Sequence, residues 1–430
     1  MKYTGNLSLS KLLKITKQAF KKIPDHRTGN IIYPIEDVLM SGLAMFGLKC
    51  PSLLNFDERR REGRVKHNLL KLYGVSQAPS DTQQRSVLDP IHPEEIQKAY
   101  KPILKHIEKE GLLSQYEHEG RLLIALDATG EFNSNHIKCP ECCTRHHKNG
   151  KTEYHHQLLA AVIVHPDKKV VLPITTEAIT QQDGQKKNDC EMNAAKRLLP
   201  RLRELFAKQK IILLCDALYA TGPFIKLLNQ NNIDYIIRAK QGKLATLYSN
   251  YVQALHTPKV HAKETNEQGY HWIDELPLNK THADIPVNFL DYWEIKNEKE
   301  HNFQWITNLT LSKNNIESVM HAGRTRWKIE NETFNTLKNL DYNLGHNCGH
   351  GKQHLATNYG LLTFLMFLLD QIQEAACEGF KQARKKTTSR RSLWEKMRIL
   401  FISYLIDSWD DLWQALIHGY KMDKLIPNTS

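Results

Sequence analysis

The stretch Leu122-Leu-Ile-Ala-Leu-Asp127 decides the fold class, because a short apolar run that ends in an acid is typical of a buried strand in an α/β core. A second run of the same kind follows at Ile211-Ile-Leu-Leu-Cys-Asp216. The other elements expected around these runs are strands over 158–165, 169–175 and 234–240, and helices over 188–208 and 221–230. The order β-β-β-α-β-α-β predicts a mixed sheet with helices on its faces.

A third conspicuous stretch, from Gly323 to Lys338, has the sequence GRTRWKIENETFNTLK. In a helix, Arg326, Glu330 and Phe334 share one face at successive i,i+4 steps, and Lys338 lies one step further. A carboxylate between two cations on one face is suited to holding a metal ion beside a phosphate. The alternative is a surface ion pair between Arg326 and Glu330, worth a few tenths of a kcal/mol.

Glu332 is the competing acid of this helix. It points about 200° around the helix from Glu330, so both cannot line the same site. We prefer Glu330 because Arg326 shares its face. Trp327 and Ile329 flank this face and are expected to pack inward against the sheet.

The three acids Asp127, Asp216 and Glu330 offer the oxygen ligands that Mg²⁺ and Mn²⁺ prefer. An Asp at the end of a buried strand is costly to keep charged without a compensating cation. Each Asp alone could simply cap the next turn. Both together, with the helix motif, favour a site for two divalent ions and metal-dependent phosphodiester chemistry.

The bulk composition of the 430 residues is that of an ordinary globular protein, with 41% hydrophobic and 25% charged residues. A formal net charge of +12 favours a polyanionic partner such as DNA. We expect no secretory signal and no membrane partner, because the most apolar segment, 355–369, is short for a bilayer span and reads as a buried core helix. Scattered cysteines fit a reducing cytoplasm.

Residues 1–115 are expected to be helical and to bind DNA. This region holds a basic cluster, and its candidate DNA-binding residues are Arg59, Arg60, Arg61 and Arg64. The alternative is a solvated helix face.

Cysteines and histidines gather in the loop 132–156. Cys139 and Cys142 have the C-x2-C spacing of half a zinc site, and Cys143 and His147 are the candidates to complete it. Further candidates are His146, His155 and His156. The alternative is a loop with reduced cysteines and exposed histidines near DNA.

Asp127, Asp216 and the Arg-Trp-Lys-Ile-Glu motif resemble the DDE transposases of bacterial insertion sequences, in the group with a Tyr-x2-Arg-x3-Glu-x6-Lys signature. The resemblance covers about residues 80–369. It implies a ribonuclease-H-like core, catalysis by Asp127, Asp216 and Glu330 on two Mg²⁺ or Mn²⁺ ions, and phosphate contacts by Arg326 and Lys338. Two departures are that Gly323 replaces the signature Tyr, and that seven residues rather than six separate Glu330 from Lys338.

The fold class expected from the residues and the resemblance is α/β, with a ribonuclease-H-like mixed sheet, flanking helices, a β-rich insertion and helical terminal regions. The expected domains are 1–115, which binds DNA; 116–240, the first part of the core; 241–301, the insertion; 302–372, the second part of the core; and 373–430, a basic helical region.

The expected function is cleavage at transposon ends and strand transfer into target DNA. The resemblance implies inverted-repeat ends and target DNA as partners, a homodimer or higher assembly on DNA, and a bacterial, nucleoid-associated location in the cytoplasm. Two alternatives stay open. One is a ribonuclease-H-like nuclease that cuts without joining, and the other is a catalytically silent DNA-binding protein descended from a transposase.

Overall fold

The computed structural model describes residues 5–180 and 187–421, which form two compact units. One unit, here the helical unit, comprises the residues up to 110 together with those from 337 onward. The other, the sheet unit, comprises residues 111–336. Residues 337–372 therefore belong to the same compact unit as the N-terminal helices.

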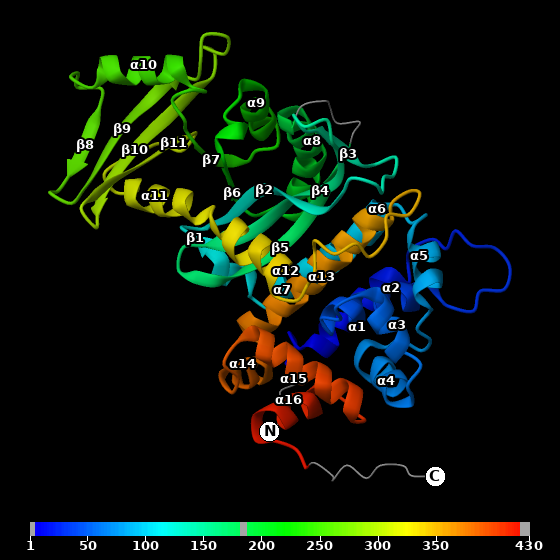
Figure 1. Ribbon diagram of the computed structural model, residues 1–430. Coiled ribbons are helices and arrows are strands. Elements are labelled where there is room, and N and C mark those ends of the chain that lie inside the picture. Colours follow the sequence, from blue (N-terminus) through cyan, green and yellow to red (C-terminus); the bar gives the residue numbers. More distant parts are fainter. Residues whose placement is uncertain (1–4, 181–186, 422–430) are drawn as a thin grey trace, which may run out of the picture. The chain divides into compact units, whose positions relative to one another are not determined.

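The helical unit is built from helices that precede and follow the sheet unit in the amino-acid sequence (Figure 1). Its helices are α1 (Leu9–Phe20), α2 (Ile35–Gly47), α3 (Leu53–Arg59), α4 (Gly63–Asn68), the π-helix η1 (Leu69–Tyr73), α5 (Asp81–Leu88), α6 (Pro93–Gln97), α7 (Tyr100–Lys109), α13 (Leu355–Ala376), α14 (Glu378–Lys385), α15 (Arg390–Ser403) and α16 (Trp409–His418). Ser80 is the N-cap of α5, since its side chain accepts a hydrogen bond from the backbone N–H of Gln83.

Helix α13 forms the core of the helical unit. Among the described residues it is the one helix whose length and apolar composition would suffice to cross a membrane, but 94% of its most apolar window is buried. It packs against α1, α2, α5, α6 and α14. A buried ion pair ties it to the end of α2, where Lys49 Nζ lies 2.7 Å from Asp370 Oδ2. The hydroxyl of Tyr342 donates to the same carboxylate at 2.6 Å, so this buried charge is both paired and hydrogen-bonded.

The sheet unit contains one mixed sheet of eleven strands. Its strands are β1 (Glu117–His118), β2 (Arg121–Ser134), β3 (Cys143–His146), β4 (Thr152–His165), β5 (Lys168–Ile179), β6 (Ile211–Cys215), β7 (Asp234–Arg238), β8 (His261–Glu264), β9 (Gln268–Pro277), β10 (Pro286–Lys296) and β11 (Lys299–Thr307). Its helices are η2 (Leu113–Tyr116), α8 (Lys187–Leu205), η4 (Ala217–Tyr219), α9 (Gly222–Gln230), α10 (Ala245–Ala254), α11 (Ile316–Thr325) and the π-helix η5 (Ile329–Phe334), and α12 (Asn335–Asn339) follows η5 directly.

The central strands combine both directions. Strand β4 lies antiparallel to β2 and to β5, while β6 and then β7 continue the sheet parallel to β2. The β4–β5 hairpin turns at Pro166-Asp167, as the sequence predicted. The expected mixed α/β sheet with flanking helices is therefore confirmed.

Helices cover both faces of this sheet (Figure 1). Helix α8 packs on β4 and β5, and α9 on β7. Helix α11 packs on β4, β6, β7 and β10, and η5 on β2 and β5. The helix that carries the Arg-Trp-Lys-Ile-Glu motif thus lies across the central strands.

The segment 241–301 is rich in strands, as expected, but it does not form a separate sheet. Strand β11 pairs antiparallel with β7, and β10, β9 and β8 extend the same sheet from there. The segment also contains helix α10, which packs on β9 and which the polar sequence did not reveal.

Gly323, which stands at the signature Tyr position, fits a close approach between α11 and β11. A Cβ atom added there would lie 2.6 Å from the indole Nε1 of Trp305. Trp305 is 3% exposed and therefore fills the space beside the helix. An aromatic side chain at residue 323 would need the space that the indole occupies.

We predict that Gly323→Ala destabilises the protein by about 1–3 kcal/mol, because the added methyl group overlaps a buried indole. Gly63→Ala is the matched control, since Gly63 also lies in a helix but has no atom within 4 Å of its would-be Cβ. Thermal unfolding would measure both changes. Equal midpoints for Gly323→Ala and the wild type would contradict the prediction, whereas Trp305→Leu in the same chain should recover part of the loss.

Candidate functional site

Two of the predicted acids lie just beyond the paired stretch of the parallel strands β2 and β6. The ladder ends at the pair Ala125 and Leu214, and each acid follows that pair by two residues. Asp216 comes just after β6, as expected, whereas β2 does not end at Asp127 but continues to Ser134. Neighbouring strands lie about 4.8 Å apart. The pairing of β2 and β6 therefore brings together two acids that are far apart in the sequence.

Both side chains leave the sheet on the face that α11 covers. Ile212 of β6 and Ile236 of β7 line one hollow together with Val319 and Ala322 of α11. Asp216 follows Ile212 by four residues and so points to the same face. Asp127 follows Leu123, the ladder partner of Ile212, by four residues and does likewise.

Asp216 also caps the turn that follows it, which was the alternative interpretation of this residue. Its Oδ1 accepts a hydrogen bond from the backbone N–H of Leu218 at 2.8 Å and so caps the short helix η4. Asp127 is held in a similar way, since its Oδ1 accepts from the N–H of Ala128 at 2.9 Å. Each of these hydrogen bonds fixes one carboxylate oxygen and thereby orients the other.

Arg326 joins the third acid to the first. Its Nη1 donates to Asp127 Oδ2 at 3.2 Å, and its Nη2 donates to Glu330 Oε1 at 2.7 Å. The Arg326 side chain is 13% exposed, against 42% for Glu330. The i,i+4 pair is therefore not an isolated surface ion pair, because the same guanidinium bridges to the end of β2.

The electrostatics of the site confirm that these groups are close. Burial raises the pKa of Asp127 to about 6, and the charges of Glu330 and Asp216 add to the rise, while Arg326 opposes it. Burial alone would lower the pKa of Arg326, but its hydrogen bond to Glu330 and the charge of Asp127 outweigh that, so the pKa is raised. One cation thus faces three acids.

The motif helix is interrupted at the site. Helix α11 ends at Thr325, and residues Ile329–Phe334 form the π-helix η5. Single π-helical turns inside longer helices are frequent at functional sites. Ile329 is fully buried, as expected, but the prediction that Trp327 packs inward is wrong, because its side chain is 57% exposed. Trp327 and Ile329 are two residues apart and so point about 200° apart around a helix, which means that both cannot face the sheet.

Lys328 fixes this interruption to the sheet. Its Nζ donates to the backbone carbonyls of His165 at 2.6 Å, Pro166 at 2.7 Å and Lys168 at 2.7 Å. These carbonyls belong to the turn between β4 and β5. Glu330, two residues further on, is thereby positioned relative to the strand that neighbours β2.

Two cations near the acids were missed in the sequence. The ladder between β6 and β7 ends at the pair Cys215 and Ile237, and Asp216 and Arg238 are the next residues of the two segments. The Arg238 guanidinium lies over the ring of Phe303, 4.9 Å from its centroid. Lys243 Nζ donates to the carbonyl of Leu218 at 2.8 Å, beside the turn that Asp216 caps. Arg238 lies near the end of the strand expected over 234–240 and Lys243 follows that strand by three residues, so cations at the end of an expected strand were the available signal.

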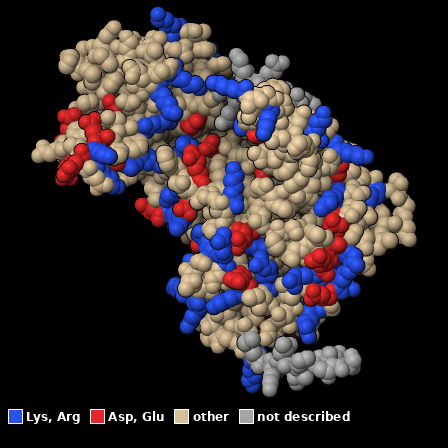
Figure 2. Space-filling view, viewed as in Figure 1, with Lys and Arg blue, Asp and Glu red and all other residues tan. Residues whose placement is uncertain are grey.

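The other predicted DNA-binding residues lie in the helical unit. Arg61 and Arg64 are exposed and Arg59 is half-buried. Arg60 is held by Asp57 at 2.5 Å and by the carbonyl of Ala78 at 3.0 Å. Lys338 is exposed on α12. Over the face shown in Figure 2, Lys and Arg side chains are spread widely, with Asp and Glu among them.

The predicted zinc ligands do not all come together. The Sγ atoms of Cys139 and Cys142 lie 3.6 Å apart. Cys143 instead donates from its Sγ to the carbonyl of Ile179 at 3.4 Å, and His147 Nε2 lies 3.1 Å from Glu153 Oε2. The histidine at the two thiols is His156, whose Nε2 lies 3.2 Å from Cys139 Sγ. The assignment of Cys143 and His147 as ligands is therefore corrected.

The three acids fit a site for hard divalent cations. Asp127 and Glu330 share the guanidinium of Arg326, and the charge of Asp216 acts on both Asp127 and Arg326, so burial makes this group of negative charges costly without a further cation. Asp127, Asp216 and Glu330 are the residues that would hold such ions.

Comparisons with known proteins agree with this geometry. A family model described as a transposase DDE domain matches residues 121–368, which is more than half of the chain. No curated protein matches the chain significantly. Among solved structures, a piggyBac transposase synaptic complex with hairpin DNA aligns over 96% of this chain and 78% of that chain. Its sequence identity is 12% and its TM-score is 0.40, so that likeness carries no argument. The match of the family model, which spans Asp127, Asp216 and Glu330, shows that the chain belongs to the transposase DDE domain family.

Proposed function

We propose that the protein is an active DDE transposase that cuts DNA at transposon ends and joins the freed ends to target DNA. The observation that carries the proposal is the convergence of Asp127, Asp216 and Glu330 on one face, with Arg326 hydrogen-bonded to the first and the third. A structural role alone does not account for three acids around one buried guanidinium, since such an arrangement is costly without added cations.

We assign the five central strands to the ribonuclease-H-like class. Support comes from the strand order β5-β4-β2-β6-β7, with β6 and β7 parallel to β2 and β4 antiparallel to it. The resemblance to insertion-sequence transposases implies this class, and Asp127 and Asp216 lie just beyond the paired stretch of its parallel strands β2 and β6.

In this proposal the three acids hold two Mg²⁺ or Mn²⁺ ions, which when bound would relieve charge on the scissile phosphate and activate the attacking oxygen. Asp127 and Asp216 direct oxygens to one place because backbone hydrogen bonds orient both carboxylates. Arg326 holds Asp127 and Glu330 at a fixed separation. Its guanidinium is also suited to contact a phosphate oxygen when the substrate enters.

Both chemical steps exchange one phosphorus–oxygen bond for another. In the first, water attacks the phosphorus at the transposon end and a 3′-hydroxyl leaves. In the second, that 3′-hydroxyl attacks a phosphodiester of target DNA and the target's own 3′-oxygen leaves. A nuclease without joining would perform only the first step, and a silent DNA-binding descendant would perform neither.

We further propose that the partners are the inverted-repeat ends of the element and target DNA, bound by a dimer or larger assembly in a bacterial cytoplasm. The net charge of +12 supports a DNA partner. Arg61 and Arg64, exposed near α3 and α4, are the proposed backbone contacts of the helical unit.

The central prediction is that Asp127→Asn, Asp216→Asn and Glu330→Gln each lower the cleavage rate by about a thousand-fold or more, because each removes a charged oxygen ligand. The substrate is DNA carrying the inverted repeats that flank the gene, with Mg²⁺ or Mn²⁺ present. Glu332→Gln is the matched control and should cleave normally. Full cleavage by all three variants would refute the site, and pre-cut ends that are never joined would favour the nuclease alternative.

A second prediction concerns pH. The pKa of Asp127 is raised to about 6 in the native state. Protonation of this carboxyl group therefore contributes to the free energy of unfolding below about pH 4, and the contribution is lost as the pH rises through about 6. Asp127→Asn should therefore stabilise the metal-free protein by about 1 kcal/mol at pH 7.5 and by almost nothing at pH 4. Thermal unfolding without divalent ions would measure this. A stabilisation that grows toward low pH would contradict the assigned shift.

The same titration predicts the effect of added metal. Mn²⁺ should raise the unfolding temperature of the wild type more at pH 7.5 than at pH 5, because only the ionised carboxylate is a ligand. Asp127→Asn should lose most of this increase at both pH values. An increase independent of pH would show that the ion binds elsewhere.

A further prediction tests the helical unit. The double variant Arg61→Ala/Arg64→Ala should weaken DNA binding and lower the slope of log K against log salt by about two, if each arginine neutralises one phosphate. Lys385→Ala/Lys386→Ala, two exposed cations outside the predicted cluster, should leave the slope unchanged. Equal slopes for wild type and the arginine variant would exclude this cluster.

A further inference from the structure

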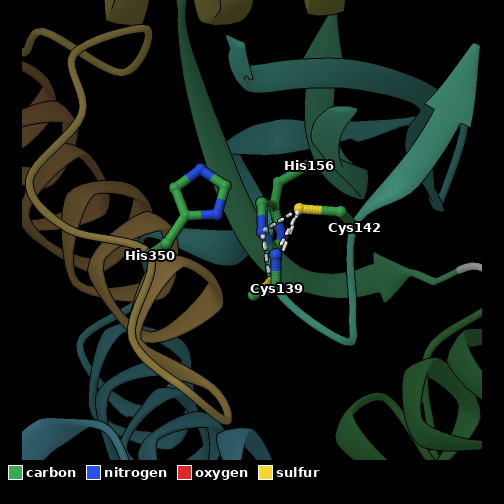
Figure 3. A group of neighbouring side chains, drawn as sticks. All are labelled: Cys139, Cys142, His156 and His350. Atoms are coloured by element: carbon green, nitrogen blue, oxygen red, sulfur yellow. Dashed lines mark hydrogen bonds between the residues drawn. The ribbon is translucent and has the colours of Figure 1, made fainter. Parts of the chain in front are cut away.

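Away from the three acids, two thiols and an imidazole lie together near the end of strand β2 and the start of strand β4 (Figure 3). Cys139 and Cys142 lie in the loop between β2 and β3, and His156 lies on β4 opposite Phe132 of β2. Cys139 Sγ is 3.6 Å from Cys142 Sγ and 3.2 Å from His156 Nε2. Cys142 Sγ is 3.4 Å from the same nitrogen.

These distances match the edges of a zinc coordination tetrahedron. With Zn–S bonds of about 2.3 Å and Zn–N bonds of about 2.0–2.1 Å, two sulfur ligands lie about 3.8 Å apart, and a sulfur and a nitrogen lie about 3.6 Å apart. The observed separations fall within a few tenths of an ångström of these values. The two sulfurs are also too far apart for a disulfide, whose bond length is about 2.05 Å.

The backbone of the loop supports the same arrangement. The N–H of Cys139 donates to Cys142 Sγ at 3.3 Å, and the N–H of Cys142 donates to the carbonyl of Cys139 at 3.2 Å. Both thiols are therefore turned to the same side of a tight turn. Cys142 is 2% exposed and His156 is 4% exposed, so two of the three groups are shielded from water.

A buried acid next to the cluster provides a second, independent observation. Glu131 lies at the bulge in β2 beside the residue that pairs with His156. It is 5% exposed, and its Oε1 has no hydrogen-bond partner. A buried carboxylate without a full set of partners is costly, and a nearby divalent cation would lower that cost.

We propose that Cys139, Cys142 and His156 bind a structural zinc ion that fastens the loop before β3 to strand β4. These three residues of the sheet unit would supply two sulfurs and one nitrogen of the four ligands of a structural zinc site. The ion would hold the end of the β2–β4 ladder at which Ser134 pairs with Tyr154, and Asp127 lies further along the same ladder, opposite Ala160. This role is separate from that of the ions that the three acids would hold, which want oxygen ligands.

The experiment is a metal analysis of the full-length protein purified from cells grown without added zinc. We expect about one zinc per chain in the wild type. Cys143→Ser and His147→Ala are matched controls, because they change a neighbouring thiol and a neighbouring imidazole outside the cluster, and they should keep the zinc. Cys142→Ser and His156→Ala should fall below about a tenth of an equivalent.

A spectroscopic measurement on the wild type avoids dependence on variants that fail to fold. After exchange of zinc for cobalt, we expect the visible bands of tetrahedral Co²⁺ together with a sulfur-to-cobalt charge-transfer band. X-ray absorption at the zinc edge should show two sulfur neighbours, with nitrogen or oxygen completing the set. His156→Cys should keep the metal and raise the sulfur count to three.

Wild-type protein with less than about a tenth of an equivalent of zinc and no cobalt spectrum would overturn the proposal. So would loss of zinc from Cys143→Ser equal to that from Cys142→Ser. Asp127→Asn separates this proposal from the transposase proposal, because that variant should lose DNA cleavage and still contain its zinc.

Discussion

The in-register pairing of two parallel strands, β2 and β6, is the constraint on which the site depends. It brings two carboxylates, Asp127 and Asp216, to positions just beyond the paired stretch of the two strands. Such a pair would repel and would be poorly solvated on a covered face. Arg326 offsets part of this repulsion, and it reaches the sheet because α11 packs closely on β11 through Gly323. The buried cation and the close helix contact are therefore parts of one arrangement.

Much of the sheet could be predicted because its strands are short, apolar and bounded by clear turns. The apolar residues before Asp127 and Asp216 are fully buried, and hydrophobic patterning alone identifies such segments, but it did not reveal that β2 continues to Ser134. The ordering of the insertion was harder to foresee. Its strands β8 to β11 alternate polar and apolar residues, and only long-range pairing with β7 determines that they extend the central sheet.

The site was predicted in its acids and in Arg326 but not in its surroundings. Trp327 was expected to pack inward beside Ile329, although residues two apart point about 200° apart around a helix. The π-helical turn at Ile329–Phe334 is invisible to a count of residues per turn. The zinc ligands show the same limit. Cys139 and Cys142 were identified by spacing, whereas His156 joins them through strand pairing, which local spacing does not encode.

Lys328 has a consequence for how this sequence could change over time. An ammonium group has three hydrogens, and here the nitrogen meets three carbonyl oxygens of one tight turn. A planar guanidinium would not reproduce that arrangement, so even arginine should be a poor replacement. Lengthening the hairpin between β4 and β5 would move those carbonyls and release the segment that holds Glu330. A surface turn far from the substrate chemistry would then tolerate insertions and deletions as badly as the acids tolerate substitution.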